Sequence, residues 1–513
     1  MARNLLLAAL LLAASAAHAE ATPAFWLNRI GFGAAPGDVE RVTALGADAY
    51  LEAQLHPGPE PKALQQRLDA LTTTRKTGAE LFGEFGPALR KLAKADEAEK
   101  RDYRDGIRAV VEDAEDAKLL RALYSPNQLQ EMLVEFWFNH FNVFSGKGLQ
   151  GRLWAGAYER EAIRPYVFGH FRDLLGATAK HPAMLFYLDN WRSAAEGFKP
   201  LFGPEKGKTI GLNENYAREV MELHTLGVDG GYNQHDVTEL ARILTGWTFD
   251  IKAMADGERG AGFRYVDRRH DHGSKVFLGQ RFGDDGVGEG ERALDLLAKN
   301  PATAHHIAFE LAQYFVADAP PPALVDAVAA TFLKTDGDLR AVVKTLLTRP
   351  EFLAGGAPKY KTPFQYVVST LRAADVDLGN LRPALGALRQ MGQPVYGCAT
   401  PDGWQDTEAA WLNPNDMLQR VSFATALGAG RLPTIAASLA KVDLVATGDT
   451  EGRVQDAVDD GTRRAERSPP LDAAAILKTS GLSLSAETRA AIDEAPTPLK
   501  AALLLGSPEF MRR

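Results

Sequence analysis

The sequence predicts a mainly α-helical fold, a large multi-helical globular body with a short β-hairpin or extended excursion near residues 263–282. Two observations lead to this fold class. Apolar residues recur at helical spacing along most of the chain, for example on one face of the segment 129–144. By contrast, the segment 263–282 (FRYVDRRHDHGSKVFLGQRF) alternates in character around a central glycine, which is typical of a hairpin.

Start and stop signals place the best-defined helices. The segment 125–128 (SPNQ) predicts a helix start, with Ser125 as the N-cap and Pro126 at the first helical position. A second helix is expected over 213–226, and a third after Asn233, whose side chain caps it, as far as residue 246. Further helical patterns cover residues 288–299, 302–315, 322–333, 339–347 and 364–375.

The first residues have the pattern of a cleavable signal peptide. Arg3 supplies a positive charge, residues 5–17 are apolar, and Ala17-His18-Ala19 places small residues before a cleavage site after Ala19. The apolar stretch is shorter than the roughly 20 residues that span a bilayer. We therefore expect export by the general secretory route to the periplasm or the exterior, with no membrane span after signal removal.

Composition indicates four parts of the chain and excludes some partners. We expect a signal peptide at 1–19, a helical domain at 20–445, a mobile loop at 446–470 and C-terminal helices at 471–513 packing on the main body. A net charge of −8 over 513 residues gives no basic field for nucleic acid. Cys398 is the single cysteine, so no disulfide forms within the chain, and we expect a small buried hydrophobe there.

The densest polar cluster runs from residue 211 to residue 247. On a helical wheel Glu219 and Glu222 share a face with Arg218, whereas His224 points the opposite way. In the next helix Glu239 and Arg242 are three residues apart and are expected to pair. Two interpretations stay open, an ion-pair network that locks two helices together or an active site.

Histidines mark the other candidate positions. His140 and His224 lie on apolar helix faces, where they are either hydrogen-bonded core residues or parts of a closed pocket that tunes an imidazole for proton transfer. His270 and His272 lie two apart in the extended segment, so they are expected on one side of a strand. A third metal ligand cannot be placed, so no metal site is assigned; Lys275 with His270 forms an alternative anion site.

Several motifs together resemble one known family. They are NRIGFGAAPGDVERV (28–42), FWFNHF (136–141), HPAMLFYLDN (181–190), GLNENYAREVMELHTLGVDGGYNQHDVTELARILTGWTF (211–249), RHDHGSKVFLG (269–279) and DGDLRAVVKTLLTRPEF (336–352). The chain resembles the bacterial exported family catalogued as domain of unknown function 1800 (DUF1800). Where that family usually has a histidine two residues before His140, this chain has Phe138. The departure leaves His140 alone to carry any acid–base or metal role there.

The resemblance implies an exported, mainly helical protein but no settled activity, cofactor or catalytic residue. Members are often encoded beside a second exported family related to sulfatase- and phosphatase-like folds, which implies a second exported protein as a partner. Our first hypothesis is a hydrolase or lyase using Glu, Arg and His acid–base chemistry on an extracytoplasmic polymer such as a polysaccharide. The alternatives are a non-catalytic binding or assembly partner of the neighbouring exported protein and a metalloprotein.

The enzyme hypothesis assigns residues to one pocket, where the His140 helix, the 213–245 helical hairpin and the His270 loop converge. There Glu219 or Glu222 is a general acid or base held by Arg218 and Arg242, and His270 and Lys275 complete the site. The predicted catalytic residues are Glu219, Glu222, Arg218, Arg242, Glu239, His270 and Lys275. The predicted pocket-lining residues are Asn139, His140, His181, Asn213, Asn215, His224, Asp236 and Asp271.

Overall fold

The computed structural model describes residues 21–200, 206–258, 260–354, 358–376, 378–431 and 470–513. These residues fold mainly into α-helices, with two small antiparallel two-stranded sheets, which confirms the predicted fold class. The predicted signal peptide and residues 446–469 of the predicted mobile loop lie outside the described residues. In the part of the chain that is described, no helix combines the length and the apolar character needed to cross a membrane.

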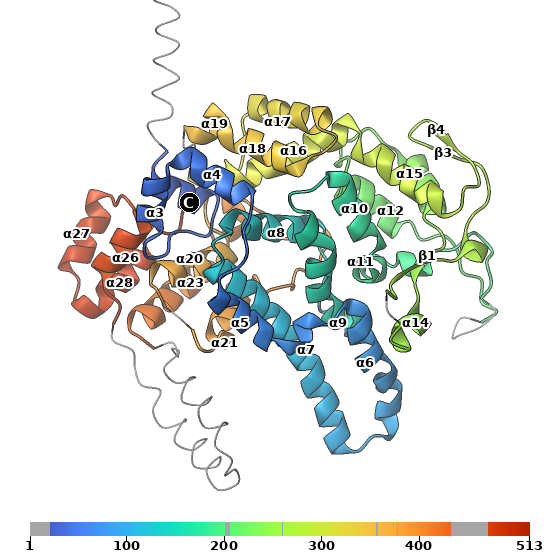
Figure 1. The fold of residues 1–513 in the computed structure, drawn as a ribbon, viewed down its shortest axis with the longest axis horizontal. Coiled ribbons are helices and arrows are strands. Elements are labelled where there is room, and N and C mark those ends of the chain that lie inside the picture. Colours follow the sequence, from blue (N-terminus) through green and yellow to red (C-terminus); the bar gives the residue numbers. More distant parts are fainter. Residues whose placement is uncertain (1–20, 201–205, 259, 355–357, 377, 432–469) are drawn as a thin grey trace, which may run out of the picture.

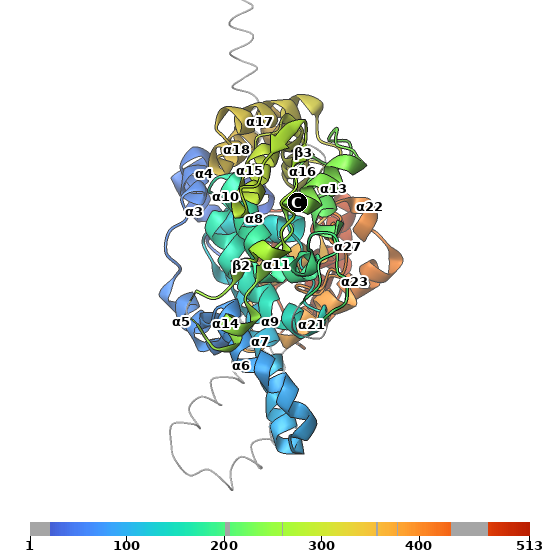
Figure 2. The ribbon, with the colours of Figure 1, turned by 90° about the vertical axis from the view of Figure 1, so that its right-hand side faces the viewer.

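The first quarter of the chain ends in a long helical hairpin. Its second arm begins at a capping box, in which the side chains of Asp96 and Glu99 each accept a backbone N–H of the other residue. The hairpin projects from the body at the bottom of both views (Figures 1 and 2). The helices of this part are α2 (Pro23–Arg29), α3 (Asp38–Leu45), α4 (Ala47–Leu55), α5 (Lys62–Ala70), α6 (Gly78–Lys91) and α7 (Glu97–Tyr124).

Helix α8 (Gln128–His140) runs through the middle of the body, and Leu129, Met132 and Leu133 on it are fully buried (Figure 1). It begins later than predicted. Ser125 is the C-cap of α7 rather than the N-cap of α8, because its hydroxyl accepts the backbone N–H of Asn127 in the link between the two helices. The helices that follow are α9 (Gly148–Tyr158), α10 (Phe171–Lys180), α11 (Pro182–Tyr187), α12 (Asn215–Glu222), α13 (Gln234–Ile243) and α14 (Ile251–Ala255).

Helix α12 is shorter than the predicted 213–226 helix. The backbone N–H of His224 bonds to the carbonyl of Glu219 five residues back, and that of Gly227 to the carbonyl of Met221, so the last turn widens and ends the helix. Gly227 has a φ of 80°, which glycine adopts without strain. The predicted cap of α13 is confirmed, with Asn233 and Asp236 forming a capping box.

Two small sheets flank these helices. The predicted hairpin is confirmed as β3 (Lys275–Phe277) paired with β4 (Gln280–Phe282), in a register that sets Lys275 opposite Phe282. The second sheet pairs β2 (Phe263–Tyr265) with β1 (Trp247–Phe249), a strand that the sequence pattern did not predict. His270 and His272 lie on neither sheet, because a 3-10 turn, η6 (Asp267–Arg269), precedes them; the expectation that they share a strand face is wrong.

The remaining predicted helices form within about two residues of their expected bounds. In α16, Asn300 accepts the N–H of Ala302 as an N-cap, and the buried side chains fall three and four residues apart. These helices are α15 (Val287–Ala298), α16 (Pro301–Phe315), α17 (Pro322–Lys334), α18 (Leu339–Thr348) and α20 (Pro363–Ala373). The short helix α19 (Pro350–Leu353) was not predicted.

The last helices lie on the left of Figure 1, where α28 packs against α23 and α26 packs against α20. The final residues return to the centre of the fold, because the guanidinium of Arg513 donates to the carbonyl of Tyr314 in α16 at 2.6 Å. These helices are α21 (Arg382–Gln390), α22 (Glu408–Trp411), α23 (Pro414–Gly428), α26 (Ala473–Ser480), α27 (Ala486–Glu494) and α28 (Thr497–Leu505).

Candidate functional site

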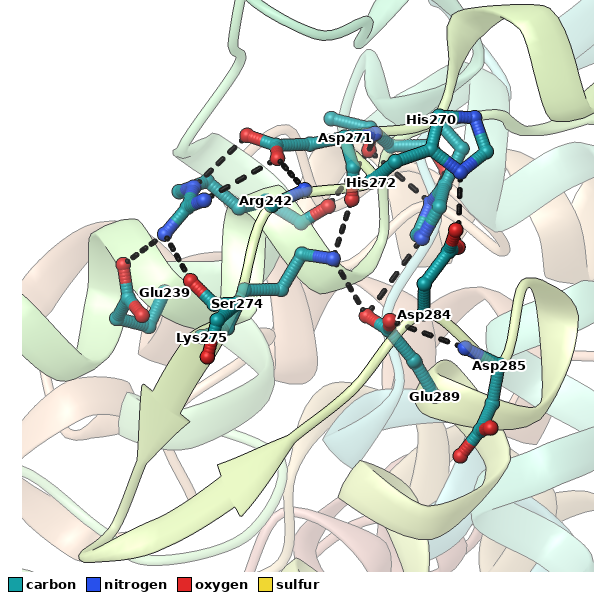
Figure 3. A network of polar contacts seen from close by, with 12 residues as sticks. Glu239, Arg242, His270, Asp271, His272, Ser274, Lys275, Asp284, Asp285 and Glu289 are labelled. Atoms are coloured by element: carbon teal, nitrogen blue, oxygen red, sulfur yellow. Dashed lines mark hydrogen bonds and ion pairs between the residues drawn. The ribbon is translucent and has the colours of Figure 1, made fainter.

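Arg242 on α13 is the centre of an ion-pair lock (Figure 3). Its Nε and Nη2 donate to the two carboxylate oxygens of Asp271, at 2.8 and 3.1 Å, and its Nη1 donates to Glu239 Oε1 at 2.7 Å. Glu239 Oε2 accepts the backbone N–H of Val276 in β3 at 2.6 Å. The predicted Glu239–Arg242 pair is therefore confirmed, and it joins α13 to the loop that follows η6 and to β3.

The charges in this lock stabilise one another. Burial alone would raise the pKa of Asp271, but hydrogen bonds from Arg242 and from the backbone of Gly273 lower it on balance. Hydrogen bonds to Asp271 raise the pKa of Arg242 in turn. Asp236, predicted to line a pocket, accepts the N–H groups of Asn233 and Leu278. The carboxylates of Asp236 and Glu239 therefore hold backbone N–H groups in place. Arg242 does not contact Glu219 or Glu222, contrary to the prediction that it holds one of them.

His270 and Lys275 lie in a sealed part of the same network (Figure 3). The ammonium of Lys275 is 2.7 Å from Glu289 Oε2 on α15, and both side chains are fully buried. His270 Nδ1 lies 3.0 Å from the carbonyl oxygen of Thr245. The predicted anion site is wrong, because a carboxylate that sequence reasoning missed already pairs with the lysine.

Glu219 and Glu222 lie half-buried on α12, away from the lock. The repulsion between them adds to burial in raising the pKa of Glu219. Arg218 pairs with Glu214 at 3.3 Å and donates to Gln234 at 3.0 Å. Since Gln234 lies on α13, these contacts form the helix–helix network that the sequence left as one of two interpretations.

Three of the predicted pocket-lining residues stabilise local backbone. The carboxamides of Asn213 and Asn215 donate to the carbonyls of Asp189 and Leu188, at 3.4 and 3.3 Å. His181 caps α11 by accepting the N–H of Ala183, and its other nitrogen contacts Glu161 at 3.2 Å. We therefore remove these three residues from the candidate site.

Asn139 and His140 do line a cavity, of about 100 Å³, between α8, α16, the start of α20 and the segment 393–406. This volume equals the share of about three water molecules in the liquid. Its wall carries four carboxylates (Glu135, Glu310, Asp402, Asp406), five carboxamides (Asn139, Gln313, Gln365, Gln393, Gln405) and three aromatic rings (Phe136, Tyr314, Trp404). Sequence reasoning found two of these residues and missed the carboxylates.

His140 and Glu310 form the closest acid–base pair at this cavity. His140 Nδ1 lies 2.6 Å from Glu310 Oε2, and Nε2 lies 3.2 Å from the carbonyl oxygen of His224. Because a carbonyl only accepts, Nε2 carries a hydrogen, and one further proton is shared between Nδ1 and the carboxylate. The His140 side chain is 2% exposed and that of Glu310 is 31% exposed, so the carboxylate faces the cavity and the imidazole lies behind it.

Two further histidines support this pair. Burial raises and His140 lowers the pKa of Glu310, with a lower value on balance, and His306 lowers it further from 3.6 Å. His224 does not line the cavity as predicted; its ring packs on Phe141 with centroids 5.0 Å apart. Burial, with His140 and His306 nearby, lowers the pKa of His224 well below its usual value, so this ring stays neutral.

Asp406, from the segment 393–406, also lines the cavity, and its pKa shifts the other way. Burial raises the pKa of Asp406, and the ammonium of Lys359, 3.0 Å from Oδ2, only partly offsets that rise. Glu135 is a third carboxylate on the wall and pairs with Lys118 at 2.7 Å. Asp406 and Glu310 are therefore two carboxyl groups at one cavity whose pKa values are shifted in opposite directions.

Asn139 of the FWFNHF motif and Asn142, directly after it, position the 398–406 wall. Asn139 donates to the carbonyl of Trp404 at 2.8 Å and accepts the N–H of Trp404 at 2.7 Å. Gly403 has a φ of 69°, and a Cβ there would lie 2.4 Å from the carbonyl oxygen of Asn139. Asn142 donates to the carbonyl of Thr400 at 2.7 Å. The asparagines shape the cavity, while His140 supplies the titratable group.

Phe138, where the family usually has histidine, does not point toward the His140–Glu310 pair. Its ring contacts Tyr396, with centroids 4.9 Å apart, and lies 5.0 Å from the ammonium of Lys118. The contact is a buried cation–π interaction. The departure therefore changes the packing behind the cavity and removes no group from the acid–base pair.

Comparison with known proteins identifies the family. The model of the family described as "Protein of unknown function (DUF1800)" matches residues 25–512, nearly the whole chain. The chain belongs to this family, as its motifs indicated. No curated protein and no solved structure matches the chain.

Proposed function

We propose that this chain is an exported hydrolase that uses carboxylate acid–base chemistry on a neutral, hydroxyl-bearing polymer such as a polysaccharide, at the cavity beside His140. The observation that carries the proposal is that Glu310 and Asp406 both line that cavity and have pKa values shifted in opposite directions. Such divergence is what general acid and base roles require. The export part rests on the signal pattern in residues 1–19.

The roles follow from the two environments. Glu310, bonded to His140 through Oε2, is the base that takes a proton from water on its other oxygen. The hydrogen that it shares with His140 Nδ1 then shifts toward the imidazole. Asp406 keeps its proton more readily, so it is the acid that protonates the leaving oxygen. Both groups therefore replace Glu219 and Glu222 as the proposed catalytic residues.

The wall of the cavity favours a neutral substrate. Carboxamides and aromatic rings supply the hydrogen bonds and apolar contacts that hydroxylated rings use. Lysine and arginine are absent among the described residues that line the cavity, and its carboxylates would repel an anion. A lyase that removes a proton next to a sugar carboxylate needs a cation to stabilise the developing charge. The lining therefore supports a hydrolase over a lyase of an acidic polymer.

One observation favours the alternative of a non-catalytic assembly partner for a second exported protein. The longest family motif, 211–249, supplies Glu239 and Arg242 to a closed lock, so much of the motif has a structural role. A cavity of about 100 Å³ also admits only a small part of a ligand. The two functions differ in whether Glu310 and Asp406 are needed for turnover.

The test uses the chain without residues 1–19. Purified protein is incubated with soluble β-1,4-, β-1,3- and α-1,4-glucans, and new reducing ends are measured for the wild type, Glu310→Gln, Asp406→Asn and Glu222→Gln. We expect losses of about 100-fold or more for the first two variants, which is the usual size of a general acid–base contribution. Glu222→Gln is the matched control, since Glu222 lies outside the cavity lining, and we expect it to keep wild-type turnover. Wild-type turnover in Glu310→Gln, or no glucan cleaved, contradicts the proposal.

A further inference from the structure

His270 has a ring nitrogen whose lone pair is buried without a hydrogen bond. Nδ1 lies 3.0 Å from the carbonyl oxygen of Thr245, which can only accept, so Nδ1 holds a hydrogen and Nε2 is the ring nitrogen that can bind a ligand. The side chain is fully buried, and Nε2 has no hydrogen-bond partner among the residues that the structure describes. A buried polar atom of this kind needs an explanation, and a bound ion supplies one.

Two carboxylates face that lone pair (Figure 3). Glu289 Oε2 lies 3.5 Å from His270 Nε2. One oxygen of Asp284, one of Glu289 and one nitrogen of His270 all lie within 4.8 Å of one another. Zinc bonds of about 2.0–2.2 Å at tetrahedral angles put neighbouring ligand atoms about 3.3–3.6 Å apart. The His270–Glu289 separation already falls in that range.

We propose that His270, Asp284 and Glu289 bind a divalent first-row transition-metal ion of the zinc class, at a site separate from the cavity and independent of the proposed hydrolase function. An imidazole nitrogen with two carboxylates suits Zn²⁺ and its neighbours, whereas Ca²⁺ takes six to eight oxygen ligands. Sequence reasoning identified His270 but could not place these carboxylates.

Each ligand also has a partner that orients it. The carbonyl of Thr245 fixes the His270 ring, as backbone carbonyls do for metal-bound histidines. Lys275 donates to Glu289 at 2.7 Å, and His272 Nδ1 lies 2.8 Å from Asp284 Oδ1. The side chains of Asp284 and His272 are half exposed, so an ion reaches the site from that side.

Bound metal would connect the loop before β3 with the start of α15. His270 belongs to that loop, whereas Asp284 and Glu289 belong to the link after β4 and to the first turn of α15. The ion would therefore add a cross-link beside the Lys275–Glu289 pair, which already connects β3 to α15. It adds to the Arg242 lock, which fixes the same loop to α13.

The test measures Zn²⁺ binding to the chelator-treated chain without residues 1–19 by equilibrium dialysis near neutral pH. We expect one ion per chain and affinity at least about 10-fold weaker in Asp284→Asn. Asp285→Asn is the matched control, because Asp285 is the next residue, is equally exposed and pairs with Arg292. Because both residues are exposed, neither variant threatens folding. No binding by the wild type at about 1 mM Zn²⁺, a weak limit for a metal site, or equal affinities in the two variants, overturns the proposal.

X-ray absorption of the zinc-loaded wild type tests the buried ligand His270 without a substitution in the core. We expect one imidazole, from His270, with oxygen ligands completing the shell. Two or more imidazoles, or none, overturn the ligand set.

Discussion

Replacement of Arg242 by methionine tests whether the 211–249 motif is a structural lock. The substitution keeps an unbranched apolar stem and removes a guanidinium that donates to Asp271, Glu239 and the carbonyl of Ser274. Asp271 and Glu239 then lose the positive charge that offsets the cost of burying their carboxylates. If these ion pairs stabilise the fold, the substitution must lower the free energy of unfolding.

The size of the loss follows from burial. Breaking a buried ion pair costs about 3–5 kcal/mol, whereas an exposed pair is worth about 0–1 kcal/mol. The side chains here are between these limits, with Arg242 25% and Asp271 20% exposed. We therefore expect Arg242→Met to lower the free energy of unfolding by about 2–3 kcal/mol. Arg242→Lys restores the charge but not the two-pronged contact with Asp271, so it should recover less than half of the loss.

The assay is urea unfolding followed by circular dichroism, with the midpoint shift converted at constant m-value. Arg264→Met is the matched control, because Arg264 pairs with Asp250 at 2.6 Å but is 55% exposed, so its loss should stay below about 1 kcal/mol. Equal midpoints for Arg242→Met and the wild type would refute the lock and return Arg242 to the list of candidate active-site residues.

Three further predictions concern burial, pH and backbone conformation. Glu289→Gln leaves the ammonium of Lys275 buried without its counter-ion, so in chelator-containing buffer this variant should lower the free energy of unfolding by about 3–5 kcal/mol. The control Asp256→Asn, which breaks the exposed pair with Lys252, should change the free energy of unfolding by less than about 1 kcal/mol. Similar urea midpoints for the two variants would contradict the prediction. Burial, with Arg420 and Arg513 nearby, lowers the pKa of Lys361 to about 7. Between about pH 7 and 10 the unfolded chain therefore binds a proton that the folded chain lacks, so the free energy of unfolding should rise with pH by up to about 1.4 kcal/mol per pH unit. Urea titrations at several pH values should show this rise in the wild type and not in Lys361→Met. Gly403→Ala forces a Cβ against the carbonyl of Asn139 and should lower the thermal midpoint. Gly386→Ala, in open space on α21, should leave the thermal midpoint unchanged or raise it. A higher midpoint for Gly403→Ala than for Gly386→Ala would show that the 398–406 wall is not constrained as described.

Local patterns were enough to predict most of the fold. The Asn233–Asp236 cap and the apolar spacing of α16 are properties of a few neighbouring residues, and both appear as expected. The start of α8 was wrong because Ser125 closes the preceding helix instead, a choice that depends on its contact with Asn127. Strand β1 was missed because three residues carry no alternation, and their pairing with β2 determines the strand.

The candidate site was only partly accessible to sequence reasoning. The Glu239–Arg242 pair is three residues apart on one helix, so spacing revealed it. His140 and Glu310 are 170 residues apart, and no periodicity connects α8 with α16. A signal was present, because His306 and Glu310 fall four apart in the otherwise apolar helix α16. No comparable signal was present for Asp406. It lies in a segment without helix or strand, and contacts of that segment with Asn139 and Lys359 determine its position.

The α12–α13 hairpin, which carries Arg242 of the lock, also contacts the histidines beside the cavity through the turn after α12. The carbonyl of His224 bonds to His140 Nε2 at 3.2 Å, and the carbonyl of Leu223 bonds to His306 Nε2 at 3.1 Å. These two carbonyls place a hydrogen on each Nε2 and fix the orientation of both imidazoles beside Glu310. Because the α12–α13 hairpin carries this turn, the contacts of Arg218 and Arg242 position the imidazoles without touching the cavity. We therefore expect Arg242→Met to reduce turnover only as far as it loosens this turn. The reduction should be smaller than that in Glu310→Gln, because the latter variant removes the proposed base itself.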